Sequence, residues 1–270
     1  MERLKVILKG AWVGATMTVP GVSGGTMAVV AGIYESLIRA INGLRKEPGK
    51  CIWFLTQFTI GALLGFVLFA RFIALLLQSE TAGEITRFFF GGVVTGGIPL
   101  LIQKSETINI KIRHVLCLVS GAAMVFLLSS MPKGMLDAGS PIAQILLQAA
   151  GGLLTAIALI LPGISVTHML YILGLYEVVL DHIYAMEFAK LIPLVTGALA
   201  GIFLTAGILE WLMKSYTTEV YLVIIGFVAG SIASLIPFGT IQSPFLGTAV
   251  FVAGFLCMFL VTRRSMHASS

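Results

Sequence analysis

The chain has 270 residues, of which 58% are hydrophobic and only 11% are charged. A soluble domain carries about 25% charged residues, so this composition excludes an ordinary soluble protein and indicates a polytopic membrane protein with one membrane domain. The formal net charge of +5 is interpreted as a topology signal rather than a nucleic-acid-binding surface, because the basic residues gather in particular loops and are not interleaved with aromatic residues.

Ten apolar segments follow in chain order, five in each half, at roughly 4–19, 24–41, 52–77, 87–102 and 112–130, then 141–161, 164–183, 188–213, 220–237 and 245–262. The first two segments of each half are short for a bilayer, which needs about 20 apolar residues. We therefore expect each pair to form a re-entrant helical hairpin, with a Pro-Gly-x-Ser turn at depth. Two full spans are the alternative.

One motif occurs twice along the chain. Pro20-Gly-Val-Ser23 returns as Pro162-Gly-Ile-Ser165, and Gly32-Ile-Tyr-Glu35 as Gly174-Leu-Tyr-Glu177, with a constant shift of 142 residues (from 20 to 162 and from 35 to 177). A duplicated interruption of apolar segments is typical of a transporter binding site built from internal repeats.

The correspondence extends beyond the motif, because paired glycines recur in the same order: Gly61 and Gly65 match Gly197 and Gly201, Gly92 and Gly96 match Gly226 and Gly230, and Gly121 matches Gly254. We predict a first repeat at 1–130, a linker at 131–140 and a second repeat at 141–265. An odd number of crossings in each half makes the second repeat inverted. The predicted fold is an all-α polytopic membrane protein of two inverted five-segment repeats, each opening with a re-entrant hairpin.

Loop charge predicts the orientation of the chain. Most of the 17 Lys and Arg residues lie in segments on the same predicted side as the amino terminus, and the other side holds only Arg87, Lys133 and Lys190. Basic loops stay in the cytoplasm, so both termini are expected there. No signal-peptide cleavage pattern follows the first apolar run. Cys51, Cys117 and Cys257 are scattered, so we expect neither a disulfide framework nor a metal site, and no cofactor.

The two Pro-Gly turns are the predicted binding site. Interrupted backbone is tolerated in lipid only where it is buried in protein or lines a wet cavity. A helix that begins there presents unpaired N–H groups and the positive end of its dipole to an anion. The candidate residues are Gly21, Ser23, Gly24, Gly25 and Thr26 in the first copy, and Gly163, Ser165, Thr167 and His168 in the second. The alternative is that each Pro-Gly pair merely kinks an ordinary helix.

Three ionisable residues within apolar segments are further candidates. Glu35 and Glu177 can couple transport to protons or a cation, although a position among the lipid head groups explains them equally well. Arg71 can reach a phosphate through its guanidinium group, or extend outward to the membrane surface. His168 replaces Thr26 in the second copy and can titrate near neutral pH, but a lone histidine in a helix is more often structural.

Ser165 and His168 also invite a catalytic dyad. The first copy argues against it, because Thr26 stands where a histidine is required, and the four histidines of the chain are too scattered for a lipid phosphatase. We therefore expect no catalytic residue. A proton- or sodium-coupled transporter of a small anion is a nearer alternative than an enzyme.

The motifs Pro20-Gly-Val-Ser-Gly-Gly-Thr-Met-Ala…Gly-Ile-Tyr-Glu35 and Leu161-Pro-Gly-Ile-Ser…Gly-Leu-Tyr-Glu177 resemble a bacterial membrane family of polyprenyl-phosphate, chiefly undecaprenyl-phosphate, translocases. The resemblance covers essentially the whole chain. It implies that the protein returns the C55 lipid carrier from the outer to the cytoplasmic leaflet of the bacterial cytoplasmic membrane, for recycling in cell-envelope synthesis. Where we expect Gly-Ser in the second motif, this chain has Val166-Thr167-His168, so the first turn is expected to dominate.

Overall fold

The structure is a computed structural model that describes residues 2–19, 21–106, 110–132, 134, 140–236 and 244–268. Across these residues the chain is helical and contains no strand, as the sequence predicted. Pro20, Lys133 and most of the predicted linker 131–140 lie outside the described residues.

Among the described residues, six helical segments are long and apolar enough to cross a membrane, which fits a multi-pass membrane protein. They lie in α4 (Pro48–Leu77), α5 (Glu80–Lys104), α6 (Ile112–Ser129), α7 (Pro141–Ile160), η1 (Phe188–Leu191) with α10 (Ile192–Ser215), and α12 (Pro244–Ala268). Proline occupies the first turn of α4 and of α7, where its missing N–H costs no hydrogen bond. Ser79 and Ser140 cap α5 and α7 by accepting from Ala82 N and Ala143 N.

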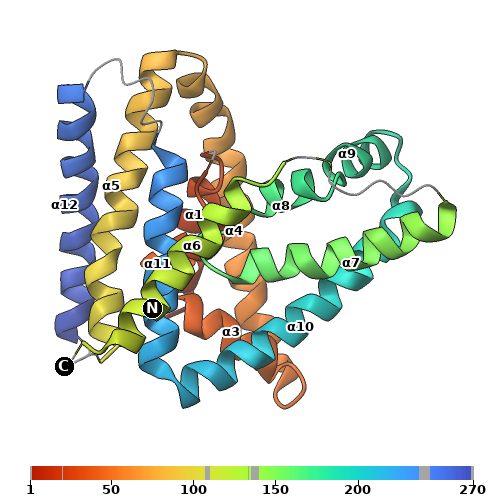
Figure 1. The fold of residues 1–270 in the computed structure, drawn as a ribbon, viewed down its shortest axis with the longest axis horizontal. Helices are drawn as coiled ribbons and strands as arrows, with labels where there is room; N and C mark the ends of the chain where they lie inside the picture. Colours follow the sequence, from red (N-terminus) through yellow and green to blue (C-terminus); the bar gives the residue numbers. More distant parts are fainter. Residues whose placement is uncertain are drawn as a thin grey trace.

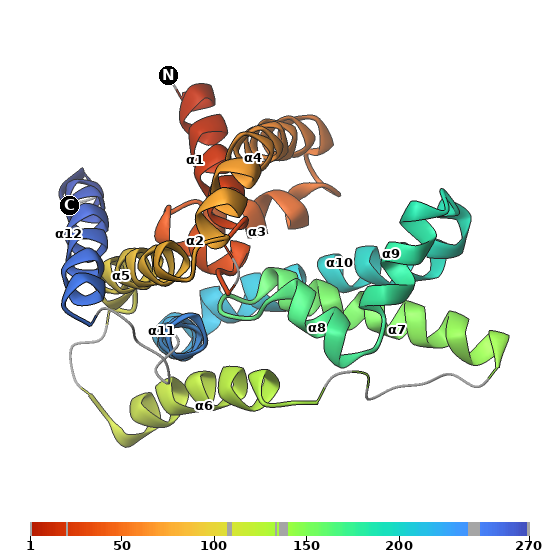
Figure 2. The ribbon, with the colours of Figure 1, turned by 90° about the horizontal axis from the view of Figure 1, so that it is seen from above.

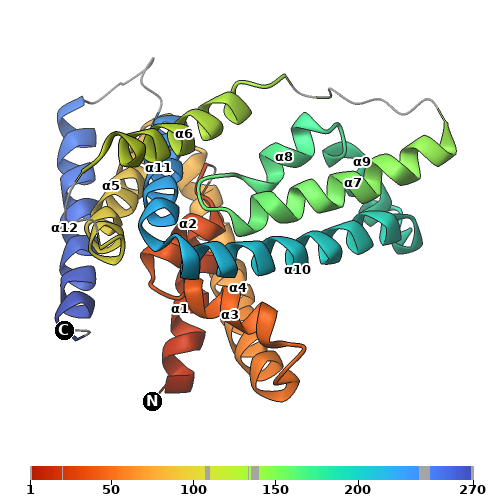
Figure 3. The ribbon, with the colours of Figure 1, turned by 60° about the horizontal axis from the view of Figure 1, so that its bottom comes forward.

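The remaining helices are shorter or less apolar. They are α1 (Glu2–Thr16), α2 (Gly24–Val30), α3 (Tyr34–Gly43), α8 (Val166–Ile172), α9 (Tyr176–Tyr184) and α11 (Thr217–Leu235). Figure 3 shows that the start of α1 and the end of α12 lie on the same side of the molecule. Their location in the cytoplasm stays a prediction.

Glycines bring the helices together in pairs whose backbones touch. In the pair α1–α4, a Cβ added to Gly14 would lie 1.9 Å from Ala62 O, and in α7–α10 a Cβ added to Gly197 would lie 1.9 Å from Ala149 O. Only glycine allows this approach, which is typical of helix packing in membranes. Figure 1 shows both pairs, with α7 and α10 projecting together from the rest of the bundle.

The other two pairs exchange helices between the halves of the chain. α6 packs against α11, and α12 packs against α5 (Figures 1 and 2). Gly121 of α6 faces Val223 O, whereas its sequence counterpart Gly254 of α12 faces Phe89 O. The last helix of each half therefore lies against the penultimate helix of the other half, so the two halves pack against each other through exchanged helices.

The two motif copies adopt the same local conformation. Ser23 has φ −85° and ψ 132°, and Ser165 has φ −86° and ψ 124°. Each precedes a seven-residue helix, α2 or α8. A glycine with positive φ stands two residues after the end of that helix, at +63° for Gly32 and +70° for Gly174. The repeated sequence thus gives a repeated backbone; its inversion across a membrane stays a prediction.

The segments 24–41 and 164–183, each expected to be a single helix, are both broken a second time. The breaks follow α2 and α8, and the axes of α8 and α9 differ by 104°. The cause is the glycine of Gly-x-Tyr-Glu, because Gly32 and Gly174 adopt a left-handed conformation that ends a helix. The pair α8–α9 is either a broken span or a re-entrant loop, so the predicted hairpin remains a prediction.

Candidate functional site

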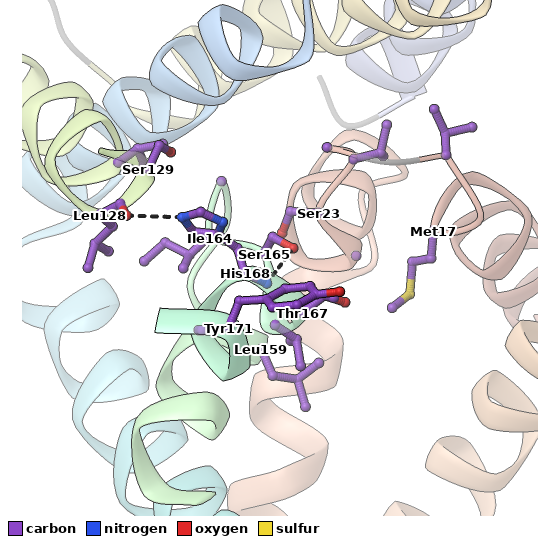
Figure 4. A pocket seen from close by; sticks show the side chains of 18 of the residues that line it. Met17, Ser23, Leu128, Ser129, Leu159, Ile164, Ser165, Thr167, His168 and Tyr171 are labelled. Atoms are coloured by element: carbon purple, nitrogen blue, oxygen red, sulfur yellow. Dashed lines mark hydrogen bonds between the residues drawn. The ribbon is translucent and has the colours of Figure 1, made fainter. Parts of the chain in front are cut away.

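The two Pro-Gly-x-Ser turns meet at one cavity of about 600 Å³. The first copy contributes Gly21, Ser23 and Gly24 to its walls, and the second contributes Gly163, Ser165, Thr167 and His168. The end of α6 adds Leu128 and Ser129. Ser23 and Ser165, both labelled in Figure 4, line this same cavity. We call it the head-group cavity.

Next to the head-group cavity, the chain around Gly163 crosses α2, and this crossing is buried. The backbone N–H of Gly163 donates to the Thr26 hydroxyl at 2.7 Å, and the Tyr34 hydroxyl donates to Ile160 O at 2.8 Å. A Cβ added to Gly25 would lie 3.2 Å from Leu161 O, so the chain before Gly163 runs directly over α2. Gly25 and Thr26, both predicted to bind the anion, are part of this crossing and are absent from the lining of the head-group cavity.

Gly163 requires its glycine for two reasons. Its φ is +82°, and an added Cβ would lie 2.4 Å from the backbone oxygen of Phe227 on α11. The second turn is therefore held between α2 on one side and α11 on the other.

The two serines differ in their hydrogen bonds. The Ser165 hydroxyl caps α8 by accepting from His168 N at 3.4 Å, whereas the Ser23 hydroxyl makes no capping bond to α2. Ser23 is only 6% exposed, yet it lines the cavity, so its hydroxyl is placed to interact with whatever occupies that space.

The His168 ring does not interact with Ser165. Its Nε2 atom lies 3.1 Å from Leu128 O at the end of α6, and Figure 4 shows the ring directed toward Leu128. A serine nucleophile needs a base within hydrogen-bonding distance of its hydroxyl, and this ring is occupied elsewhere. In this arrangement His168 ties α8 to α6.

The walls of the head-group cavity include no lysine and no arginine among the residues that the structure describes. Arg71, the predicted countercharge, is exposed on α4 and does not line the cavity. Hydroxyl groups, the bare backbone of the glycines and the His168 ring therefore provide its polarity. A head group bound here would be held by hydrogen-bond donors rather than by an ion pair with a lysine or an arginine.

The two motif glutamates have different surroundings. Glu35 forms an ion pair with Lys104 of α5 and accepts a hydrogen bond from the Tyr221 hydroxyl of α11. Glu177 is exposed on α9. The motif itself does not distinguish these residues, because both follow the same Gly-x-Tyr spacing and the partners of Glu35 are distant along the chain.

Glu35 lies in a second cavity, of about 450 Å³, that we call the charged cavity. Its other charged residues include Arg39 and a pair in which Lys214 Nζ lies 2.6 Å from Glu210 Oε1. The cavities are separated along α11, because Tyr221 lines the charged cavity and Phe227, which contacts the second turn, lies about 9 Å farther along the helix. The two cavities share no lining residue among those described.

A family model described as undecaprenyl phosphate translocase-like matches residues 13–250. The chain belongs to this family. The match covers both motif copies and confirms the resemblance that the motifs indicated. No solved structure is significantly similar to the chain.

Two relatives of this family member carry the same name. A polyprenyl-phosphate transporter of Staphylococcus aureus is 30% identical over 271 residues, which cover 95% of each chain. A polyprenyl-phosphate transporter of Vibrio cholerae is 27% identical over 252 residues, which cover 88% of this chain and 79% of the relative. The similarity thus spans both halves rather than a single motif.

Proposed function

We propose that the protein is a translocase that carries undecaprenyl phosphate, or a related polyprenyl phosphate, from the outer to the cytoplasmic leaflet of the bacterial cytoplasmic membrane. The returned lipid carrier is then available for another round of cell-envelope synthesis. Membership of the family supports this proposal, as do two relatives named polyprenyl-phosphate transporters.

One structural observation carries the proposal: Ser23 and Ser165, from motif copies 142 residues apart, line the same cavity. The phosphate is held there by hydroxyl groups and by backbone N–H groups that the glycines leave accessible. The first turn dominates, because it retains Gly24 and Gly25 after the serine, whereas the second has Val166 and Thr167. Arg71 is a proposed countercharge that approaches the head group in another conformation.

Transport proceeds by alternating access between two states related by the inverted repeats. We infer that the Thr26–Gly163 crossing, which joins the two motif copies beside the head-group cavity, is closed in the conformation described here. Passage of the phosphate requires this crossing to open. Glu35 and Glu177 are the proposed coupling residues, with protons or sodium as the driving ion; the direct interactions of Glu35 with α5 and α11 favour it over Glu177.

The test is translocation in reconstituted vesicles. Purified protein is incorporated into liposomes that contain a labelled polyprenyl phosphate, and an impermeant phosphatase is added outside. Only lipid in the outer leaflet is then hydrolysed, so a translocase raises the hydrolysed fraction from about half toward completion. Unchanged hydrolysis, with the protein folded and inserted, would contradict the proposal.

A glycine variant links transport to the cavity. Gly24 lines the head-group cavity, so a valine there places a side chain in the proposed phosphate site and covers backbone that the glycine leaves accessible. Gly24→Val should therefore abolish translocation while leaving membrane insertion intact. Gly49→Val is the matched control, because a Cβ added there meets nothing within 4 Å. Normal transport by Gly24→Val would refute the turn as the phosphate site.

The alternative is a proton- or sodium-coupled transporter of another small anion. The charged cavity favours it, because Arg39, Lys104 and Lys214 offer cations to a soluble anion. Uptake of labelled inorganic phosphate into the same vesicles distinguishes the two functions. Anion uptake without lipid translocation would establish the alternative.

A further inference from the structure

An apolar cavity of about 280 Å³ adjoins the head-group cavity. The two cavities share Met17, Gly24 and Leu159 in their walls. From this common wall the apolar cavity extends between α1, α3, α4 and α10, where Val13, Leu37, Phe58 and Ile202 line it. It therefore lies next to the proposed phosphate site and has the opposite chemistry.

The lining suits a hydrocarbon and offers almost nothing to a polar ligand. Tyr34 and Thr59 are its only residues with polar side chains among those described. The Tyr34 hydroxyl already donates to Ile160 O, and Thr59 lies at the exposed edge on α4. A cavity lined in this way binds apolar groups and excludes a phosphate.

Met17 lies at the junction of the two cavities. Its sulfur is 2.7 Å from the position that a Cβ of Gly24 would take, so the absence of a side chain at Gly24 allows Met17 to lie across the junction. Methionine is unbranched and adapts its shape readily, and Met17 is 41% exposed. A ligand that spans both cavities can displace it without moving the backbone.

The outer rim of the apolar cavity faces the bilayer. Thr59 of α4 and Ile202 of α10 stand on helices whose outer faces carry exposed apolar residues, such as Leu63 and Leu199. α3 lies between these two helices and contacts both (Figure 2). A long chain that enters the cavity can therefore continue into the lipid beside α3.

We propose that the apolar cavity binds the first isoprene units of the transported lipid while its phosphate occupies the head-group cavity. This inference rests on the proposed function and adds to it a subsite for the tail. The head-group cavity is lined by no lysine or arginine in the described chain, so burial of the tail supplies most of the binding free energy. The tail subsite also selects polyprenyl phosphates over soluble phosphates, which lack a hydrocarbon chain.

A series of phosphate monoesters tests the subsite. Butyl, geranyl and farnesyl phosphate are compared as competitors of labelled polyprenyl phosphate binding to the purified protein. Each isoprene unit that enters the cavity should raise the affinity by at least about tenfold, because each buried methylene group contributes to binding. Equal affinity for butyl and farnesyl phosphate would overturn the subsite, even if the protein translocates the lipid.

Two tryptophan variants locate the effect. Ile202→Trp fills the cavity from its rim, so it should remove the gain from butyl to farnesyl phosphate and leave the affinity for butyl phosphate unchanged. Leu199→Trp is the control on the same helix, because Leu199 is 51% exposed and lies outside the cavity. A chain-length gain that persists in Ile202→Trp would place the tail elsewhere and overturn the proposal.

Photolabelling gives a measurement on the unmodified protein. A farnesyl phosphate with a diazirine on its first isoprene unit should crosslink to Val13 or Leu37. Crosslinks confined to the outer face of α10, at residues such as Val195 and Leu199, would contradict the subsite. The proposed function is tested separately, by lipid translocation in vesicles. A failure of the tail subsite can therefore be distinguished from a failure of the proposed function.

Discussion

Gly163 donates its backbone N–H to the hydroxyl of Thr26 over 2.7 Å, across 137 positions of the chain. This bond joins the turn of the second motif copy directly to the helix that follows the first. Thr26 is 1% exposed and Gly163 is buried, so neither group can be satisfied by solvent while the crossing is closed. The bond is therefore a measure of how tightly the two motif copies are held together.

Thr26→Val is predicted to destabilise the crossing. Valine keeps the shape of threonine but leaves the Gly163 N–H buried without an acceptor, which costs about 1–3 kcal/mol. The expected result is a lower thermal unfolding midpoint of the purified protein and slower or leakier translocation. Thr26→Ser retains the hydroxyl and should stay close to wild type. An unchanged midpoint in Thr26→Val would mean that the bond contributes nothing.

Gly163→Ala is predicted to be far more damaging than Gly134→Ala. Both glycines have positive φ, +82° and +70°, so alanine is strained at each by about 1–2 kcal/mol. Only at Gly163 would the added Cβ also lie 2.4 Å from Phe227 O, whereas at Gly134 it meets nothing within 4 Å. Thermal unfolding of the two variants isolates the effect of the close contact. Equal losses would show that the second turn can move away from α11.

The ion pair of Glu35 with Lys104 is predicted to contribute more to transport than the exposed Glu177 does. Glu35→Gln and Lys104→Gln should each slow translocation severalfold, because Glu35 joins α3 to α5 and α11. The double variant should be less impaired than the product of the single effects, since both remove the same interaction. Glu177→Gln, on the exposed face of α9, is the matched control.

The vesicle assay with an imposed proton or sodium gradient extends this comparison to coupling. If Glu35 couples transport, Glu35→Gln should make the remaining translocation independent of the gradient. A gradient dependence that survives in Glu35→Gln but disappears in Glu177→Gln would reverse the assignment of the two residues.

The internal repeat was the most informative feature of the sequence, because it depends on local residue patterns. Gly121 and Gly254 could be matched from the sequence, and they occupy equivalent contacts in the structure. What the pattern could not give is the partner of each helix. Hydropathy identifies α6 and α12 as apolar, but their exchange between the halves depends on long-range packing.

Only the part of the site that depends on local residue patterns could be predicted from the sequence. Ser23 and Ser165 were identified by their turn, and they line one cavity. Tyr34, Lys104 and Tyr221 were missed, because their roles come from partners far away in the chain. The second break in each segment could have been predicted locally. Gly32 and Gly174 occupy the same place in the repeated Gly-x-Tyr-Glu motif, and a left-handed glycine is a common helix end.

The unequal hydrogen bonding of the two serines gives a last prediction. Ser165 caps α8, so Ser165→Ala should lower the free energy of unfolding by about 0.5–2 kcal/mol and weaken lipid-phosphate binding only slightly. Ser23 makes no capping bond and lines the cavity. Ser23→Ala should therefore leave the unfolding midpoint near wild type and weaken lipid-phosphate binding severalfold more than Ser165→Ala does. Thermal unfolding and competition binding on the same preparations measure both effects. Equal binding losses with unchanged stability would mean that the phosphate contacts the two turns alike, and the first turn would then hold no advantage over the second.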